Sequence, residues 1–460
     1  MNRPPHPELI ASDVGASRAG GAAGVLRLAP SSTPMHAPPQ IGSPTAAPAA
    51  SKGISLQTFS ALRHGGFRLL WIGTVCTTIA QFLQAFTLSW LAYERTGSAA
   101  IVGIVVASTA VLALIVGPLA GVLSDRFDRR KLGMIGQGVL AASAMVLALL
   151  VGTGVMELWH LLAYGLISGA AWSLIHPVRH ALTPMTVPRT DLLNAVALNS
   201  MALHSSRLIA PVLGGILVGA VGIGANFGVL AAASLIALAT FRLLGAHPAQ
   251  RRASDEQSER ASFAASFVAG LRYIRHDQTV CSVLLLGMIV QFLLLPTFAI
   301  VPVFAIEMIG AGPEVAGFLF GVSGIGALVA TFVLASLGNV RHKGAALLGT
   351  AFGVGVALAL CSLTSSLLAV AAFLVLVGVA HGTFFSLNNA LLQANTADAY
   401  RGRVTSISTL NQSAVFLGGL LVGPLAARVG SPATFAAMGV AIAGISLWIG
   451  WRVPRLRSLS

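Results

Sequence analysis

Charged residues are scarce in this chain of 460 residues: only 9% are Asp, Glu, Lys or Arg, and 14 residues are acidic. Soluble domains contain about 25% charged residues and about 45–50% apolar ones. Here 55% of the residues are hydrophobic. So little charge cannot cover a water-facing surface of this size, and most of the surface must face lipid. The composition therefore excludes an ordinary soluble protein and predicts a polytopic membrane protein.

Cysteine is also rare. Cys76, Cys281 and Cys361 lie far apart within apolar runs, which indicates small buried residues and no disulfide or metal framework. His176 and His180 share one helix face, but no third metal ligand lies near them in the sequence. The chain has no glycine-rich phosphate loop followed by Lys and Ser or Thr, and no nucleophile triad. We therefore expect no enzyme activity, no metal, no cofactor and no ATP-driven pump.

The formal net charge is +14, a balance that also occurs in proteins that bind nucleic acid. In this chain, however, Lys and Arg fall in short clusters between apolar runs. Loops on the cytoplasmic side of a membrane carry such clusters. We therefore expect the lipid bilayer, and not nucleic acid, to be the partner of these basic residues.

Twelve predominantly apolar runs are long enough to cross a membrane, which takes about 20 residues in a helix. One polar stretch divides them into two sets of six. The predicted fold class is an all-α polytopic membrane protein with twelve transmembrane helices in two pseudo-symmetric six-helix bundles. The approximate limits of the runs are 68–93, 99–123, 132–153, 157–178, 194–220, 224–245, 279–306, 314–337, 344–363, 366–392, 404–427 and 432–452.

Five regions follow from this pattern. Residues 1–64 are rich in Pro, Ala, Ser and Gly and are expected to form a disordered cytoplasmic tail; a mis-assigned start codon within them is the alternative. Residues 65–245 and 278–453 are expected to form the two six-helix bundles. Residues 246–277 are expected to form a polar cytoplasmic loop between the bundles, and residues 454–460 a short cytoplasmic tail.

Lys and Arg are distributed unevenly between the two sides of the predicted membrane. With the N-terminus in the cytoplasm, one side carries the cluster at 126–131, the loop at 246–277 and the basic C-terminus, whereas the other side carries only Arg95 and Arg428. Basic loops favour the cytoplasm. We therefore expect a multi-pass protein of the cytoplasmic (inner) membrane with both termini in the cytoplasm.

The two halves also resemble each other in sequence. Residues 93–97 match residues 306–310, and both stretches end in glycine. Asn199 before Pro211 likewise matches Asn411 before Pro424. Parallel repeats related by an axis along the membrane normal are typical of transporters whose substrate site lies between the repeats.

A dense charge cluster follows the second apolar run. It reads Gly121-x-Leu123-x-Asp125-Arg126-x-x-Arg129-Arg130-Lys131 and resembles the signature found after the second helix in the major facilitator superfamily. The resemblance covers roughly residues 65–455 and implies a cytoplasmic gate latch formed by Gly121, Asp125, Arg126, Arg129, Arg130 and Lys131. A basic loop that only sets topology is the alternative. The counterpart in the second half has Asn339 in place of the acid, so the two halves are expected to differ at this gate.

The fifth apolar run contains a second motif, Arg207-x-x-Ala210-Pro211-x-x-Gly214-Gly215. It resembles the antiporter signature of drug-exporting members, and the surrounding pattern is similar to the branch that includes siderophore (enterobactin-type) and macrolide exporters. Ala210, Pro211, Gly214 and Gly215 suit a helix bend that controls leak or, equally, general helix packing.

Arg207 is the only formal charge well inside a predicted span. Charges at that depth normally face a cavity or a partner. We expect Arg207 to contact the substrate or to organise a proton site. A structural pairing with Gln81 and Gln84 of the first run is the alternative.

Proton coupling usually needs a titratable acid in the cavity, and no acid lies at mid-depth in any run. Glu94 and Glu307, near the outer ends of the first and seventh runs, are candidate coupling groups; ordinary acids at the membrane surface are the alternative. Asn388 and Gln393 are candidate cavity residues, although polar groups also hold membrane helices together.

These features predict a monomeric secondary active transporter that works by alternating access. We expect proton-coupled efflux of a small amphipathic molecule, drug-like or siderophore-like, across the cytoplasmic membrane. Two other functions stay open: an importer or facilitator of a small polar metabolite on the same fold, and a non-transporting membrane receptor.

Overall fold

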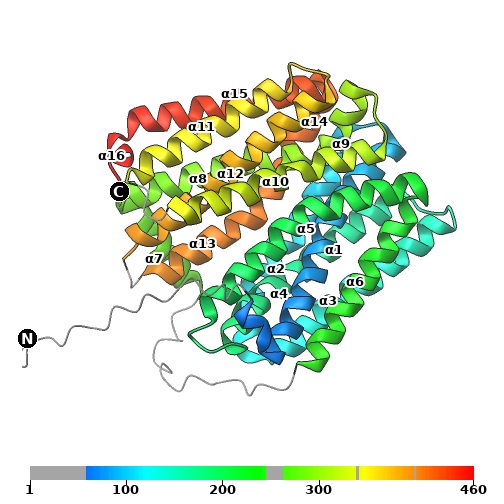
Figure 1. Cartoon of the computed structure of the whole chain (residues 1–460), viewed down its shortest axis with the longest axis horizontal. Helices are drawn as coiled ribbons and strands as arrows, with labels where there is room; N and C mark the ends of the chain where they lie inside the picture. Colours follow the sequence, from blue (N-terminus) through cyan, green and yellow to red (C-terminus); the bar gives the residue numbers. More distant parts are fainter. Residues whose placement is uncertain (1–58, 245–262, 338–340, 398–399, 460) are drawn as a thin grey trace, which may run out of the picture. The chain divides into compact units, whose positions relative to one another are not determined.

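The computed structural model describes residues 59–244, 263–337, 341–397 and 400–459 (Figure 1). Within these ranges, the side chains at 118, 121–122, 124–126, 263–267, 335–337, 406 and 409–414 are not described. Every regular element in the described part is a helix. The all-helical prediction is therefore confirmed.

Six long helices form the first half. A 3-10 turn, η1 (Ser60–Arg63), precedes them, and η2 (Thr183–Met185) follows the fourth. The helices are α1 (Gly65–Thr96), α2 (Ala99–Arg126), α3 (Arg129–Gly152), α4 (Leu158–Leu182), α5 (Leu192–Ala220) and α6 (Ile223–Leu243).

The second half begins with α7 (Phe263–His276), a short helix inside the stretch expected to be a loop. Its Tyr273 ring stacks on Tyr400 with centroids 4.4 Å apart, so this helix packs beside the start of α13. The remaining elements are α8 (Gln278–Ala299), α9 (Val301–Phe304), η3 (Ala305–Ile309), α10 (Pro313–Leu337), α11 (Lys343–Cys361), α12 (Leu367–Asn395), α13 (Arg401–Ala414), η5 (Val415–Gly418), α14 (Gly419–Val429), α15 (Ser431–Arg452) and α16 (Pro454–Arg457).

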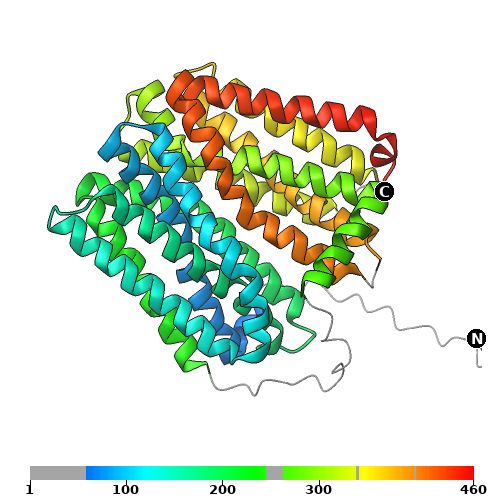
Figure 2. The same ribbon diagram turned by 180° about the vertical axis from the view of Figure 1, so that it is seen from behind.

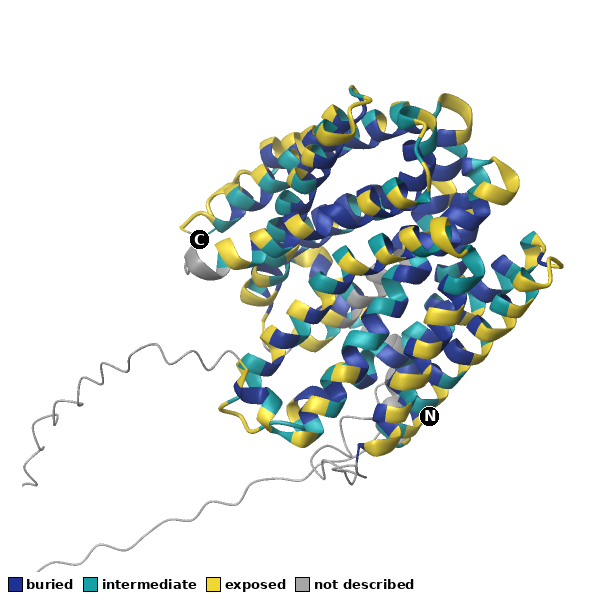
Figure 3. Ribbon diagram, turned by 45° about the vertical axis from the view of Figure 1, so that its right-hand side comes forward, coloured by how far each residue is buried: buried dark blue, intermediate teal, exposed yellow. Residues whose placement is uncertain are grey.

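Eleven helices of the described part are long and apolar enough to cross a membrane. The twelfth crossing is the interrupted segment α13–η5–α14, whose apolar part, Val415–Val429, is shorter. With this segment, the described part of the chain has twelve membrane-crossing segments in two sets of six, in agreement with the prediction. Figure 3 shows exposed residues along the outward helix faces, and many are large and apolar, such as Ile115, Leu149 and Leu447, as lipid requires.

Two crossings are broken where the sequence pattern predicts continuous helices. The seventh run, 279–306, divides at Ile300 between α8 and α9 and ends in the π-helical turn η3. Pro296 and Pro302 flank the break, and each proline removes one backbone hydrogen bond. The eleventh run, 404–427, divides at η5. Discontinuous helices of this kind occur near transporter binding sites.

Paired glycines mark the repeat between the halves. Gly97 ends α1 with φ 61°, and Gly310 ends η3 with φ 68°. Gly222 precedes α6 with φ 101° and ψ 164°, and Gly430 precedes α15 with φ 85° and ψ 158°. A positive φ favours glycine, so the same two turns are built the same way in each half.

The halves meet along two close helix pairs. A Cβ added to Gly103 of α2 would lie 2.2 Å from the Gly419 carbonyl oxygen of α14, and one added to Gly317 of α10 would lie 2.3 Å from the Pro211 oxygen of α5. Small residues let membrane helices approach backbone to backbone. The back view shows α2 beside the orange helix that continues into α14 (Figure 2). In each pair the beginning of one helix, α2 or α10, meets the later part of a crossing, which is α14 or the second half of α5. These contacts hold the halves together at the end that carries Gly97 and Gly310.

Candidate functional site

Arg207 lies near the middle of α5, and its guanidinium carbon stands 5.2 Å from the centroid of the Phe298 ring. α5 belongs to the first half and α8, which carries Phe298, to the second, so this contact crosses the junction. A cation–π contact contributes about 0.5–1 kcal/mol when exposed and about 2 kcal/mol when desolvated. An arginine at the centre of a span costs about 2.5–3.5 kcal/mol on insertion scales. Phe298 therefore offsets only part of the cost of burying this charge.

No acid of the described part offsets the remaining cost of burying the Arg207 charge. Among the described residues, no carboxylate lies within 4.0 Å of the Arg207 guanidinium; the ion pair between His64 and Asp191 lies at the beginning of α5. A buried charge is stabilised when it is paired and hydrogen-bonded. Arg207 is thus a half-buried cation at the junction of the halves, and it contacts the aromatic ring of Phe298.

Two histidines accompany Arg207. His204 precedes it by one turn of α5, and His381 of α12 lies within electrostatic range of both residues. The His381 side chain is 5% exposed, and neither of its ring nitrogens has a hydrogen-bond partner among the described residues; the same is true of Nδ1 of His204. The sequence did not single out His204 or His381 for a role, because imidazoles inside apolar runs carry no pattern that shows which of them will meet.

Helix α10 explains how α5 and α12 come together. A Cβ on Gly324 would lie 2.9 Å from the backbone nitrogen of Leu208, and one on Gly378 would lie 2.0 Å from the Ser323 oxygen. α10 thus packs on α5 with one face and on α12 with another. Ser323 is fully buried, and its hydroxyl lacks a partner within the described part of the chain.

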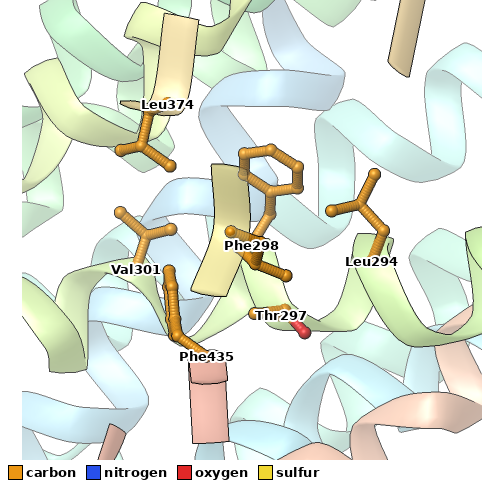
Figure 4. A pocket seen from close by; sticks show the side chains of 7 residues that line it. Leu294, Thr297, Phe298, Val301, Leu374 and Phe435 are labelled. Carbon is orange, nitrogen blue, oxygen red and sulfur yellow. The ribbon is translucent and has the colours of Figure 1, made fainter. Parts of the chain in front are cut away.

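Phe298 also borders an apolar space in the second half (Figure 4). The space has an empty volume of about 150 Å³. Its lining comes from α8, α9, α11, α12 and α15: Leu294, Thr297, Phe298, Val301, Leu358, Leu374 and Phe435. Phe298 therefore lies between the Arg207 cation and an apolar region.

The structure does not support the pairing of Arg207 with Gln84. The Gln84 amide donates to Ser168 at 2.9 Å and accepts from Tyr164 and Trp172, each at 3.3 Å. Gln84 therefore connects α1 to α4 inside the first half. Gln81 has a buried Oε1 that lacks a partner among the described residues.

Glu94 and Glu307 lie at helix ends, as expected, and differ in their contacts. Glu94 is exposed. Glu307 accepts hydrogen bonds from the Ser431 amide at 2.8 Å and the Ser431 hydroxyl at 2.5 Å, and from the Tyr93 hydroxyl at 3.4 Å. A carboxylate at a helix N-terminus stabilises that helix, so Glu307 fixes the start of α15 and touches the end of α1.

The two polar candidates on α12 have different surroundings. Asn388 is buried against Gly287 of α8, and its Oδ1 has no partner within the described ranges. Gln393 is exposed, and its backbone oxygen accepts from Arg401 at 3.2 Å. In the described structure, neither side chain makes a hydrogen bond to Arg207.

The comparison with known proteins decides the family. A model of the family described as transmembrane secretion effector matches residues 56–459. The chain belongs to this family of major facilitator superfamily transporters.

Curated relatives agree with this membership. An uncharacterized MFS-type transporter of Bacillus subtilis, YfiS, is 26% identical over 80% of this chain and 89% of its own length. Macrolide efflux protein A of Streptococcus pyogenes is 22% identical over 83% and 94%, and the enterobactin exporter EntS of Shigella boydii is 24% identical over 82% and 89%.

Solved structures share the fold. A POT family transporter in complex with a thioalcohol conjugated peptide superposes with a TM-score of 0.69 at 13% identity, over 85% of this chain and 96% of that one. A bacterial homolog of the human lysosomal transporter Spinster gives 0.67 at 16% identity, over 85% and 97%. At these identities the likeness establishes the fold alone.

In this transporter the superfamily signature joins α2 to α3. The side chains of Gly121, Asp125 and Arg126 lie outside the described residues. Asp128 caps α3 by accepting from the Arg130 amide at 2.9 Å, and the Arg130 side chain donates to the carbonyls of Phe241 (2.7 Å) and Arg242 at the end of α6.

The two neighbours of Arg130 in the signature, Arg129 and Lys131, lie in surroundings that differ from those of Arg130. Arg129 donates to the Met185 sulfur at 3.7 Å, and Lys131 is exposed. A basic side chain at a helix C-terminus satisfies its free carbonyls. The described half of the signature therefore fixes α3 to α6 and to η2 within the first bundle.

The second motif does not interrupt α5, which runs unbroken through Pro211. A Cβ on Gly214 would lie 2.6 Å from Leu83 of α1, and one on Gly215 would lie 2.4 Å from the Pro313 oxygen of α10. Ala210 is fully buried. In this state the four small residues serve close packing, toward α1 on one face and toward α10 on another.

Proposed function

We infer that this transporter is a secondary active exporter. It moves a small amphipathic molecule out of the cytoplasm by alternating access, in exchange for protons. The observation that carries the proposal is the Arg207–Phe298 contact, which puts a half-buried cation at the junction of the two halves. The efflux direction is supported by the curated relatives named for macrolide efflux and enterobactin export.

The proposed orientation places both termini in the cytoplasm of the inner membrane, since the basic loops gather on one side of the spans. In that orientation the close pairs α2–α14 and α5–α10, and the Tyr93–Glu307–Ser431 contacts, lie at the outer side. The structure then represents a state whose outer side is closed.

The cytoplasmic latch stays part of the proposal. α2 contacts α13, the first part of the eleventh crossing, and the positive N-terminal end of a helix attracts an acid, worth about 0.3–1 kcal/mol at an exposed site. Asp125, in the last turn of α2, is the residue assigned to this latch.

The test is efflux from cells. A deletion strain and its complemented parent are loaded with fluorescent amphipathic dyes, and the loss of dye is followed with and without a protonophore. We expect faster, protonophore-sensitive loss in the complemented strain. Equal rates for all dyes, together with slower entry of a polar metabolite in the deletion strain, would favour the importer instead.

A further inference from the structure

The surroundings of Arg207 point to the charge of the transported molecule. Arg207 presents a guanidinium with five N–H donors, and its carbon lies 5.2 Å from the centroid of the Phe298 ring. No carboxylate of the described part lies within 4.0 Å. A cation held in a span without an acid nearby normally faces a partner, and an anionic ligand would supply one.

The unpartnered polar atoms beside Arg207 suit the same partner. His204 and His381 contribute ring nitrogens without hydrogen-bond partners in the described structure, and His381 is only 5% exposed. A neutral imidazole offers one N–H donor, and a protonated one offers two. Buried polar groups are ordinarily hydrogen-bonded, so these donors are expected to be satisfied when a ligand is bound.

The arrangement also discriminates by charge. A carboxylate accepts a bidentate pair of bonds from an arginine and still has lone pairs for an imidazole N–H. An ammonium ligand would meet the Arg207 cation, which has no carboxylate within 4.0 Å among the described side chains. Leu294, Val301 and Phe435, which line the space beside Phe298, are apolar, so this side of the site offers no second charge to a ligand.

We propose that Arg207, His204 and His381 form a binding site for a carboxylate-class anionic group on an otherwise apolar ligand. Arg207 and His204 belong to the first half and His381 to the second, so the anion contacts both halves at once. This assignment rests on the proposed function and narrows its substrate class from amphipathic molecules in general to acidic ones.

The experiment uses the full-length protein in lipid nanodiscs and two probes that differ in charge, 1-naphthoate and its neutral amide, 1-naphthamide. Binding is measured by isothermal titration calorimetry. We expect naphthoate to bind at least about tenfold more tightly than naphthamide, as hydrogen bonds to a charged group suggest. Arg207→Gln should remove this preference, Arg207→Lys should keep part of it, and His381→Gln should reduce it severalfold.

Arg179 of α4 is the matched control, because it is a half-buried arginine of another span whose Nε and one terminal nitrogen have no partner among the described residues. Arg179→Gln should keep the full preference for naphthoate. Thermal unfolding of each variant separates loss of the site from loss of the fold. Equal affinity for the two probes, or the same loss in Arg179→Gln as in Arg207→Gln, would overturn the assignment.

The two proposals fail separately. Protonophore-sensitive efflux without preference for naphthoate would leave the exporter standing and remove the anion site. A naphthoate preference that depends on Arg207, in a protein that moves no dye outward, would keep the site and remove the exporter.

Discussion

At the scale of single residues, the contact between the Arg207 guanidinium and the Phe298 ring joins the two halves at the proposed site. Arg207 was predicted as a functional candidate because a lone cation inside an apolar run is conspicuous, and the structure places it at the junction of the halves. His204, His381, Ser323 and Phe298 were not predicted as its neighbours. His381, Ser323 and Phe298 lie on three helices other than α5, and His204 has no sequence pattern that marks it. Only the packing of α5, α10 and α12 brings these residues together.

Phe298 gives a residue-scale prediction. Phe298→Leu keeps an apolar side chain but removes the ring that faces Arg207. The lost cation–π contact is worth about 0.5–2 kcal/mol, so efflux should fall by about two- to thirtyfold at unchanged expression. The measurement is dye efflux normalised to protein in the membrane, and Leu294→Met, in the same apolar lining, is the control expected to retain efflux.

Asp191 gives a second residue-scale prediction, on pH. The hydrogen bonds from His64 (2.8 Å) and Ser60 (3.0 Å) hold the pKa of the Asp191 carboxyl below its usual value. These two hydrogen bonds form a clamp between η1 and α5. Because the pKa of Asp191 is lower in the folded protein than in the unfolded chain, the clamp is fully stabilised at pH values above about 4, the pKa of an aspartate in the unfolded chain. That stability is lost as the pH falls through the lower folded pKa.

The clamp can be followed by limited proteolysis at the exposed Phe59, directly before η1. Cleavage should be slow at neutral pH and accelerate below about pH 4, measured with an acid-tolerant protease. Asp191→Asn should cleave quickly at every pH. A wild-type clamp that opens between pH 5 and 7 would contradict the role given to this carboxyl.

At the scale of elements, apolar length predicted all twelve crossings but not where two of them break. Length and composition are local properties of the sequence. The break at Ile300 lies between Pro296 and Pro302 and depends also on distant neighbours. Gly418 is one of them, because a Cβ added to it would lie 2.7 Å from the Pro296 ring. The η1 turn was likewise assigned to the tail, because its contacts with Asp191 and Asn194 span more than a hundred residues.

The α2–α14 pair gives the prediction at this scale. Gly103→Ala would insert a Cβ 2.2 Å from the Gly419 oxygen, and overpacking of this kind costs about 1–3 kcal/mol. The state closed at that end should become less populated, and efflux should fall severalfold. Gly117→Ala is the control on the same helix, because its Cβ would meet nothing within 4 Å; equal loss in both variants would rule out the packing explanation.

At the scale of the whole molecule, the orientation stays a prediction from the basic loops. In a variant lacking Cys76, Cys281 and Cys361, a cysteine introduced at exposed Glu94 should react with a membrane-impermeant maleimide in intact cells. One introduced at exposed Arg189 should react only after the cells are opened. The reverse pattern would invert the topology and place the closed end in the cytoplasm.

Outward, proton-driven transport through a site at Arg207 is tested most directly in inside-out membrane vesicles, where export appears as uptake. With a proton gradient, acid inside, the wild-type protein and Arg179→Gln should concentrate an exported dye, and a protonophore should release it. Arg207→Gln should take up at least about tenfold less. Uptake that does not depend on the proton gradient, or that is equally fast in Arg207→Gln, would contradict proton-driven export through a site at Arg207.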